Sequence, residues 1–434
     1  MVISSVLLDV IERYAEEASL LWLRRNVAER APHFNLDDLA RLDEQLEAHV
    51  DGLRVAEAGT PMAAWETCER ELCWNEPGEV FPAAILAWES GQEKRLRTVV
   101  KAAGKSDECS QAIVSSLGWL KDEQATPHID HLLAHSKGFQ RRVGIAACAV
   151  RGLDPGEALT MAVASSDKLL KARALRAIGE LARHDLLSAA KEGLRSRDLG
   201  CKFAAAWSLA RLSDDSQAIE VLKRIVESQA LGKEELRQPE YASCFPRALQ
   251  LVLRKVDAKA STKWLNKLAQ NPKLVRQAVI GAGVVGTPDS TPWLLSLMSV
   301  PELARVAGEA ITMITGLDLA AEKLDGDRPA GFESGPTEDP ADENVAMDED
   351  ENLPWPDAAK LAAWWERRRA DFEPQTRYLC GKPLTEEWLD HVLKHGYQRQ
   401  RAAAALELAI RAPERPLFNV RAPGRRQQQL LGLK

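Results

Sequence analysis

The chain repeats an alanine-rich helix about every thirty residues, a period typical of stacked helix pairs. The clearest copies begin at Gln111, Arg142, Arg173, Lys202, Arg276 and Arg305. Small residues such as Ala146 and Ala177 let neighbouring helices approach, while Leu175 and Ile178 recur at a helical step and supply a buried stripe. Because one helix pair cannot bury that stripe alone, the pattern predicts an all-α fold in which successive pairs stack.

An aspartate and a second, shorter helix follow each copy. The aspartates are Asp122, Asp154, Asp185, Asp214, Asp289 and Asp318. We interpret them as helix caps rather than catalytic acids, because an aspartate at a helix start accepts the unpaired amides of the first turn. The pattern resembles HEAT repeats over roughly residues 77–318, and this resemblance implies an α-solenoid, an architecture that hosts many functions.

The helical pattern divides the chain into four predicted regions. They are an N-terminal helical cap (1–76), a HEAT-like repeat solenoid (77–325), an acidic flexible insertion (326–356) and a C-terminal helical module with an extended basic tail (357–434). The insertion is predicted because the helical period stops, acidic residues accumulate and no Lys or Arg occurs between Arg328 and Lys360.

The tail begins at Pro413. It is expected to be extended, because Pro413, Pro416 and Pro423 oppose a regular helix. Phe418 and Val420 are expected to hold the tail against the helices of the chain, leaving its arginines to meet carboxylates, with those of the insertion as one option.

Composition narrows the classes of partner. The formal net charge is -7, and Lys and Arg are spread through the helices, so we expect no broad nucleic-acid-binding face. No run of about eighteen apolar residues is present, and the N-terminus lacks the pattern of a secretion signal, so we expect a cytoplasmic protein without a membrane partner. The seven cysteines are odd in number and lack paired short spacing, and Cys148 and Cys201 lie in alanine-rich helices, where a buried thiol is expected.

Glycines at 281, 283 and 286 form a pattern that is similar to a dinucleotide-binding turn. The repeat register places this pattern in an alanine-rich helix, and Pro288 interrupts the helix that would receive the phosphates. The residues after Asp348 faintly resemble a calcium loop, but Leu353 stands where such a loop needs glycine. We therefore expect no cofactor.

A histidine row, His128, His131 and His135, lies on one face of a predicted helix. Zinc can use such spacing, although no nearby Cys, Asp or Glu obviously completes its shell, and a surface row of histidines is the alternative. Twelve tryptophans include the adjacent Trp364 and Trp365, which point about 100° apart on a helix and cannot both face one core. One of them is expected to contact another domain, the insertion or a partner, and packing between the C-terminal module and the last repeat is the use that we favour.

Both ends of the chain resemble an uncharacterised proteobacterial HEAT-like repeat family. The resemblance rests on the segments 14–24, 31–33, 39–43 and 48–53, and on Trp364-Trp365, 377–383 and 421–427. Members of that family are encountered in type VI secretion gene clusters, near effectors and their loading proteins. The resemblance therefore implies an accessory role in type VI secretion, as an immunity protein that masks a toxin or as an adaptor that loads an effector.

We find no convergent nucleophile, acid and base, so the sequence indicates a non-enzymatic scaffold that binds a protein. The second helices (124–135, 185–195 and 214–228) are expected to line a concave binding face. The candidate partner-binding residues are His128, His131, Lys191, Glu192, Glu220, Lys223, Arg224, Trp364 and Trp365. The alternatives are a nucleic-acid-binding HEAT-like protein and a metal-dependent enzyme; no catalytic, cofactor-binding or metal residues are assigned.

Overall fold

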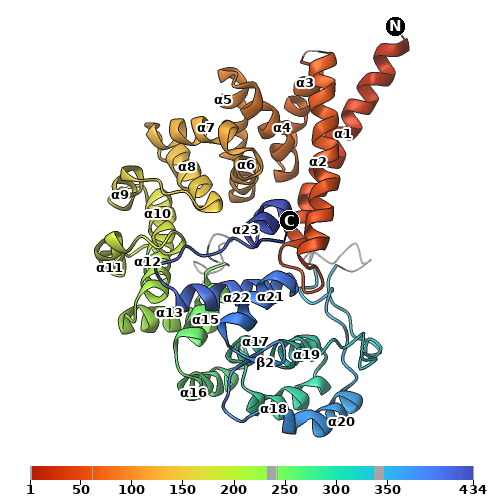
Figure 1. The fold of residues 1–434 in the computed structure, drawn as a ribbon, viewed down its shortest axis with the longest axis vertical. Helices are drawn as coiled ribbons and strands as arrows, with labels where there is room; N and C mark the ends of the chain where they lie inside the picture. The colour runs from red at the N-terminus through yellow and green to blue at the C-terminus, as the bar shows by residue number, and fades with distance from the viewer. Residues whose placement is uncertain (1, 61, 232–240, 242, 337–346, 434) are drawn as a thin grey trace. The chain divides into compact units, whose positions relative to one another are not determined.

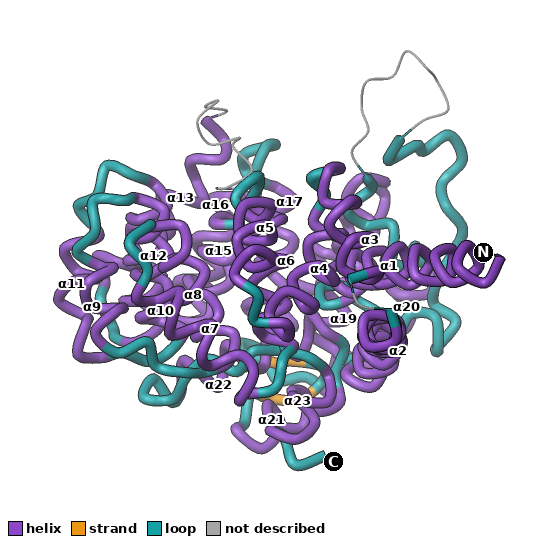
Figure 2. The backbone as a smooth tube through the Cα atoms, turned by 90° about the horizontal axis from the view of Figure 1, so that it is seen from above, coloured by secondary structure: helices purple, strands orange, loops and turns teal. Residues whose placement is uncertain are grey.

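The computed structural model of the protein describes residues 2–60, 62–231, 241, 243–336 and 347–433. This part of the chain is all-α apart from one two-stranded hairpin (Figure 1), and Figure 2 shows the same predominance of helix along the backbone. Nowhere in it does a helix combine the length and apolar character that a bilayer crossing requires.

Two compact units make up the chain: Met1–Leu212 with Pro413–Lys434, and Ser213–Ala412. The boundary at Leu212 falls inside the predicted repeat region, which sequence reasoning treated as one body. The tail groups with the first unit rather than with the rest of the predicted C-terminal module. Each unit is described separately below.

The first unit begins with two long helices, α1 (Val2–Ala28) and α2 (Leu36–Gly59). Asn35 and Asp38 form a capping box at the start of α2, in which each side chain accepts the backbone N–H of the other residue. The shorter elements that follow are α3 (Ala63–Glu71), η1 (Leu72–Trp74), α4 (Pro77–Ser90), α5 (Glu93–Ala103), α6 (Asp107–Trp119), α7 (Asp122–Ala134), α8 (Gly138–Arg151), α9 (Glu157–Val163), α10 (Lys168–Glu180), η2 (His184–Leu186), α11 (Leu187–Gly193), α12 (Leu199–Leu212) and, at the far end of the chain, α23 (Gly424–Leu430).

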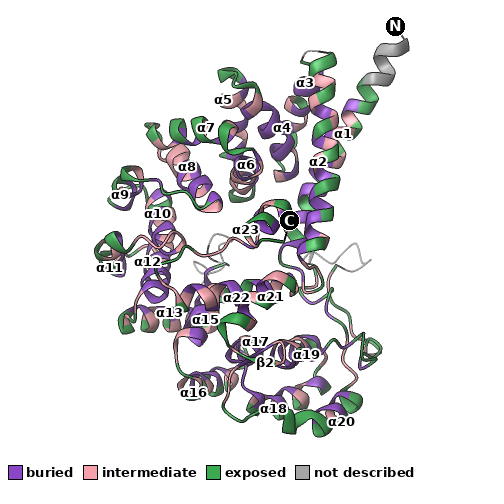
Figure 3. Ribbon diagram, viewed as in Figure 1, coloured by how far each residue is buried: buried purple, intermediate pink, exposed green. Residues whose placement is uncertain are grey.

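The alanine-rich helices of this unit, α4, α6, α8, α10 and α12, each pack against the next. Small residues permit the close approach: the amide of Gly179 in α10 donates to Ser208 Oγ of α12 at 3.0 Å, and a Cβ at Gly179 would lie 2.5 Å from that oxygen. Figure 1 shows the second helices α5, α7, α9 and α11 on the side of this row that faces away from α23, and Figure 3 shows their outward sides as exposed. In this unit the second helices therefore do not take the inner position that we expected for them.

Three of the recurring aspartates link successive helix pairs instead of capping a helix. The pairs are Asp122–Arg151, Asp154–Arg183 and Asp214–Lys255, the last of these lying in the second unit. The cap of the helix after Asp214 is its neighbour Asp215, whose side chain accepts the amide of Ala218. The cap assignment is wrong at these three positions because each carboxylate reaches a cation near the C-terminal end of a later helix.

The C-terminal segment, defined here as residues 413–430, crosses the ends of the first-unit helices. The amide of Leu417 donates to the carbonyl of Glu180 in α10 at 2.9 Å, and the Asn419 side chain donates to the carbonyl of Val150 in α8 at 3.1 Å. Val420 is buried, as the sequence predicts.

The end of this segment differs from the prediction of an extended tail. Helix α23 starts directly after Pro423 and runs over Gly424–Leu430. Proline opposes the interior of a helix but is compatible with its start, since its missing N–H would be unpaired there. The prolines therefore limit the extended part to the residues before α23.

The second unit contains further helix pairs and a C-terminal group of elements. Its elements are α13 (Ser216–Ser228), η3 (Gln229–Leu231), α15 (Cys244–Lys255), α16 (Ala258–Ala269), α17 (Val275–Val285), η5 (Pro288–Ser290), α18 (Thr291–Ser296), η6 (Leu297–Ser299), α19 (Pro301–Thr315), α20 (Ala358–Arg368), η7 (Arg369–Asp371), β1 (Tyr378–Leu379), β2 (Lys382–Pro383), α21 (Glu386–His395) and α22 (Gln398–Arg411). Helix α17 packs against α15 and α19, and β1 pairs antiparallel with β2.

The glycine pattern at 281–286 lies within and at the end of α17. A Cβ at Gly281 would lie 2.4 Å from the Leu265 side chain, and one at Gly283 would lie 3.0 Å from the Ala310 backbone. Gly286 ends the helix with φ of 76°, a conformation that glycine adopts without strain. These glycines serve close helix packing and helix termination, which is the role that the repeat register indicates.

The acidic insertion is closed at its base. The amide of Gly326 donates to the carbonyl of Trp355 at 2.8 Å, and that of Asp357 donates to Leu324 at 2.9 Å. Asp350 is buried and forms a two-pronged ion pair with Arg276, at 2.8 and 2.6 Å. Cations of the second unit therefore bind the carboxylates of Asp348 and Asp350, while the flexibility of the insertion stays a prediction; residues 337–346 lie outside the described part.

Candidate protein-binding surface

The first unit carries the predicted residues of α7 and α11. His128 is half-buried, its Nε2 lies 2.7 Å from the carbonyl oxygen of Trp88, and the two rings are 5.0 Å apart. His131 is exposed on the next turn, with its ring 5.9 Å from that of His135. His128 is therefore engaged by the chain itself, while His131 remains accessible.

The described residues contain no cluster of three His, Cys, Asp or Glu side chains arranged to hold a metal ion. Lys191 and Glu192 are both exposed on α11. Together with His131, they give the outward helices of the first unit a polar surface of mixed charge.

Glu220, Lys223 and Arg224 lie on α13 of the second unit. The Arg224 guanidinium pairs with Glu220 one turn earlier at 3.1 Å, and both side chains are exposed. The Lys223 ammonium lies 5.7 Å from the ring centroid of Trp264 in α16. Such a cation–π contact holds the lysine stem along the apolar ring while its charge stays at the surface.

Glu227 connects α13 to α16. It accepts a hydrogen bond from Trp264 Nε1 at 2.9 Å and pairs with the Lys267 ammonium at 3.0 Å. Burial raises the pKa of the Glu227 carboxyl, but these two donors outweigh that effect and leave the pKa lowered. Glu227 is therefore an ionised group already engaged by the chain, and it holds the two helices together.

Trp364 and Trp365 do not form an accessible surface. They are 8 % and 6 % exposed, Trp364 Nε1 donates to Glu322 at 2.9 Å, and the Trp365 ring lies 5.6 Å from that of Phe372. Both predicted anchors are thus packed within the second unit. The two side chains point in different directions on α20, and each contacts a different residue of the second unit. This burial corrects their assignment as residues that bind another protein.

Sequence reasoning missed a hollow between η3 and α16. It is an open depression of about 450 Å³ whose apolar lining includes Leu231, Leu268 and Leu274. Leu231 is 64 % exposed, which is high for a leucine that has apolar neighbours. Arg224 and Lys267 stand among the residues that line it.

Exposed lysines continue along α16. Lys259, Lys263 and Lys267 are spaced four residues apart and all three are exposed, so they form one stripe on the helix. Lys273, just beyond the helix, places its ammonium 3.4 Å from the carbonyl of Ala230, next to the hollow. The regular lysine spacing in Ala258–Ala269 was the sequence signal for this surface, but the hollow beside it depends on η3.

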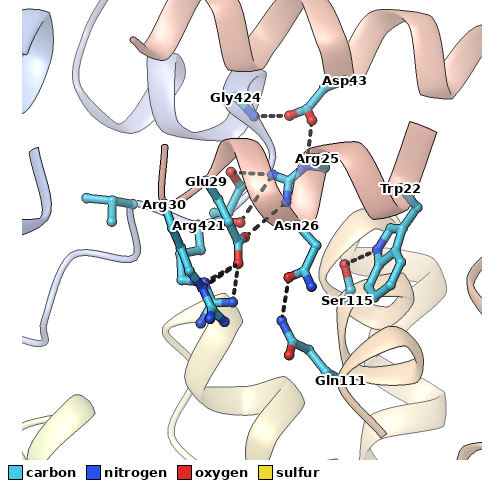
Figure 4. Close-up of polar contacts among 12 residues, drawn as sticks. Trp22, Arg25, Asn26, Glu29, Arg30, Asp43, Gln111, Ser115, Arg421 and Gly424 are labelled. Atoms are coloured by element: carbon cyan, nitrogen blue, oxygen red, sulfur yellow. Dashed lines mark hydrogen bonds and ion pairs between the residues drawn. The ribbon is translucent and has the colours of Figure 1, made fainter. Parts of the chain in front are cut away.

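The first unit also holds a buried polar cluster where the C-terminal segment meets α1 and α2 (Figure 4). Arg25 Nε donates to Asp43 at 2.5 Å, and Arg25 Nη2 donates to the carbonyls of Arg421 and Ala422 at 3.1 and 3.0 Å. The same Asp43 accepts the amide of Gly424 at 2.6 Å. Arg25 thus binds the backbone of the C-terminal segment as well as a side chain of α2.

The carboxylates around Arg25 stabilise its positive charge in this buried position. Burial lowers the pKa of the Arg25 guanidinium, but the carboxylates of Asp43 and Glu29 outweigh burial and raise it. Glu29 also pairs with Arg421 of the segment. Two arginines of the tail therefore meet carboxylates, as expected: Arg421 pairs with Glu29, just after α1, and Arg425 pairs with Glu44 of α2.

No known protein-family model matches the chain, and comparison with curated proteins finds no match.

Proposed function

We propose that this protein is a non-enzymatic α-solenoid scaffold of HEAT-like repeats that binds another protein. The observation that carries the proposal is the repeated separation of roles between paired helices. The first helices pack on one another, as α8 does on α10, while the second helices present charged side chains outward. Such a division gives a rigid support and a long polar surface, which suits recognition of a protein.

The linking ion pairs support the solenoid part of this proposal. Asp122 pairs with Arg151, and Arg151 also donates to the carbonyls of Leu117 and Leu120 at 2.6 and 3.0 Å. One arginine thereby joins the end of α8 to the end of α6 and the start of α7. Contacts that connect each pair only to its neighbours are the basis of repeat stability.

The binding surface in this proposal is the outward side of the second helices. In the first unit its residues are His131, Lys191 and Glu192, and in the second unit Glu220, Lys223 and Arg224 form a separate set. Mixed charges of this kind favour a partner with complementary charges, because electrostatic matching sets specificity and the rate of association. The partner in our proposal is a type VI secretion effector or toxin, bound by an immunity protein or by a loading adaptor in the cytoplasm.

The test begins with affinity purification of the tagged protein from its native cells and identification of the co-purifying protein by mass spectrometry. The purified partner is then titrated calorimetrically against wild type and against the double variant Lys223→Glu/Arg224→Glu. We expect binding to weaken by more than about 1 kcal/mol, since two cations of the surface are reversed. Thermal unfolding should change little, because Arg224 is exposed and Lys223 is half-buried.

The matched control is Arg367→Glu/Arg368→Glu, a double reversal at exposed positions of α20. This variant changes the net charge by the same amount as Lys223→Glu/Arg224→Glu and should leave the affinity for the partner nearly unchanged. Equal affinities for wild type and the α13 variant would exclude this surface. If nucleic acid co-purifies instead of protein, the chain is a nucleic-acid-binding protein and not a protein-binding scaffold. If it turns over a substrate only when a metal ion is present, it is a metal-dependent enzyme.

A further inference from the structure

We infer that the hollow between η3 and α16 binds an acidic peptide segment that carries an aliphatic side chain. The inference rests on the proposed function and adds the chemical nature of what the scaffold recognises. Its two elements are an exposed apolar depression and a row of cations beside it. An extended segment with carboxylates on both sides of a leucine or isoleucine would satisfy both.

The apolar part is formed by three leucines. Leu268 and Leu274 are buried at the base, whereas Leu231 stands at the rim with 64 % of its surface exposed. An incoming aliphatic side chain would cover Leu231 and displace water from apolar surface, which favours binding. The depression of about 450 Å³ is large enough for one such side chain and adjacent backbone.

The cationic part extends along α16. Lys259 and Lys263 are exposed, and neither forms an ion pair with any residue that the structure describes. Lys267 shares Glu227 with Trp264, so its ammonium is only partly neutralised. Because the lysines follow one stripe, their charges add along the path that a bound segment would take.

The two nearby carboxylates on α13 do not cancel this charge. Glu220 pairs with Arg224, and Glu227 pairs with Lys267, which leaves the other lysines of the stripe to meet an anionic ligand. Charge complementarity therefore selects an acidic segment over a basic or neutral one.

A peptide fits this surface better than a nucleic acid does. Single-stranded nucleic acid is usually held by exposed aromatic rings that stack on bases. The aromatic residue here, Trp264, is only 7 % exposed and its ring faces Lys223. The hollow instead offers aliphatic groups, which contact an aliphatic side chain rather than the face of a base.

The experiment measures fluorescence polarisation of labelled peptides with the full-length protein. The probe is an acidic peptide with a central leucine, compared with a version in which serine replaces the leucine and with a basic peptide of equal length. We expect the leucine peptide to bind, the serine version to bind about tenfold more weakly, and the basic peptide to show no binding. Affinity for the leucine peptide should fall as salt is raised.

Two variants locate the site. Leu231→Ser removes the exposed apolar group without disturbing a buried one, and Lys263→Glu/Lys267→Glu reverses the stripe. Each should weaken peptide binding by about tenfold or more, while the α20 control variant Arg367→Glu/Arg368→Glu should bind as wild type does. Circular dichroism and thermal unfolding check the fold; should the lysine variant be unstable, Leu231→Ser alone decides the outcome.

Unchanged peptide affinity in Leu231→Ser would overturn the inference. So would a single-stranded oligonucleotide that binds more tightly than the leucine peptide and is lost in the lysine variant, since the surface would then belong to nucleic acid. Failure here is separable from failure of the proposed function. If the native partner loses affinity for Lys223→Glu/Arg224→Glu but not for Leu231→Ser, the scaffold role stands and only this inference fails.

Discussion

Gly424 donates its backbone N–H to Asp43 Oδ2 at 2.6 Å, and its Cα lies so near α2 that no side chain fits between them. A Cβ built at Gly424 would be 2.6 Å from the Cα of Ala40, closer than real Cβ atoms approach a backbone. Only a glycine at position 424 therefore allows the start of α23 to pack this closely against α2. The C-terminal segment is packed as an integral part of the first unit.

Replacing Gly424 by alanine tests this relationship. We expect Gly424→Ala to lower the free energy of unfolding by about 1–3 kcal/mol, because either the backbone of α2 or the segment must shift to admit the methyl group. The measurement is thermal or urea unfolding followed by circular dichroism. The control is Gly59→Ala in the last turn of α2, where an added Cβ meets nothing within 4 Å; it should be neutral or slightly stabilising. Equal stability of the two variants would contradict the close fit.

Deleting residues 413–434, which include the C-terminal segment, should lower the melting temperature by several degrees, on the order of 5 °C or more. The deletion removes the carbonyl acceptors of Arg25 and Arg211 and leaves both buried guanidinium groups without them. Deleting only residues 432–434 serves as the control and should preserve the melting curve. A full deletion that melts like wild type but no longer binds the partner would make the segment a docking element instead.

Glu71 should make stability depend on pH. Burial, together with the carboxylates of Glu16 and Glu79, raises its pKa to about 7 in the folded protein. A raised carboxyl pKa stabilises the fold through the protonated form, so this contribution is complete below the unfolded pKa and is lost as pH rises through about 7. Glu71→Gln should therefore be more stable than wild type at pH 8, on the order of 1 kcal/mol after allowing for partial exposure, and similar to it at pH 4.

The comparison variant is Glu66→Gln, which removes an exposed carboxylate from the same helix. Its unfolding free energy should stay within about 0.5 kcal/mol of that of wild type, as is usual for a substitution at an exposed position. Urea unfolding at several pH values supplies the measurement. A pH-independent difference for Glu71→Gln would show that this carboxyl has the same pKa in the folded and the unfolded protein.

The helices were predictable because their information is local. Alanine and leucine at helical spacing define α10 and α12 from the sequence, and the capping box at Asn35 marks where α2 begins. The role of Asp122 was not predictable in the same way, because its partner Arg151 lies 29 residues further along the chain. Local reasoning finds a cap wherever an aspartate precedes a helix, and it cannot identify a cation brought near by stacking.

The candidate protein-binding surface, too, could be predicted from local sequence patterns only in part. Exposure of Glu220 and Arg224 follows from the amphipathic pattern of α13, and the sequence identifies them. The burial of Trp364 does not follow, because Glu322, which accepts its indole N–H, precedes it by 42 residues across the insertion. The hollow beside Leu231 was also missed, since it exists only where the end of η3 meets α16.

The described ends of the acidic insertion should resist proteolysis, contrary to the expectation that cleavage begins anywhere between Gly326 and Asn352. Asp350 is buried, binds Arg276 through two hydrogen bonds, and offers its carbonyl to Arg305 at 2.8 Å. Asp350→Asn removes the buried one of the two carboxylates that pair with Arg276, so we expect a loss of roughly 2 kcal/mol in unfolding free energy. Limited proteolysis with mass mapping should then show new cleavage within residues 347–356 of the variant.

Glu349 provides the matched control, because it also pairs with Arg276, at 3.3 Å, but its side chain is 81 % exposed. Glu349→Gln should change the unfolding free energy by less than about 0.5 kcal/mol, as is usual for an exposed ion pair. Its cleavage pattern should match that of wild type. If both variants lose equal stability, the buried ion pair is not what anchors this part of the insertion. If neither variant loses stability, these carboxylates do not hold the insertion, and the expectation of a mobile insertion stands for these residues.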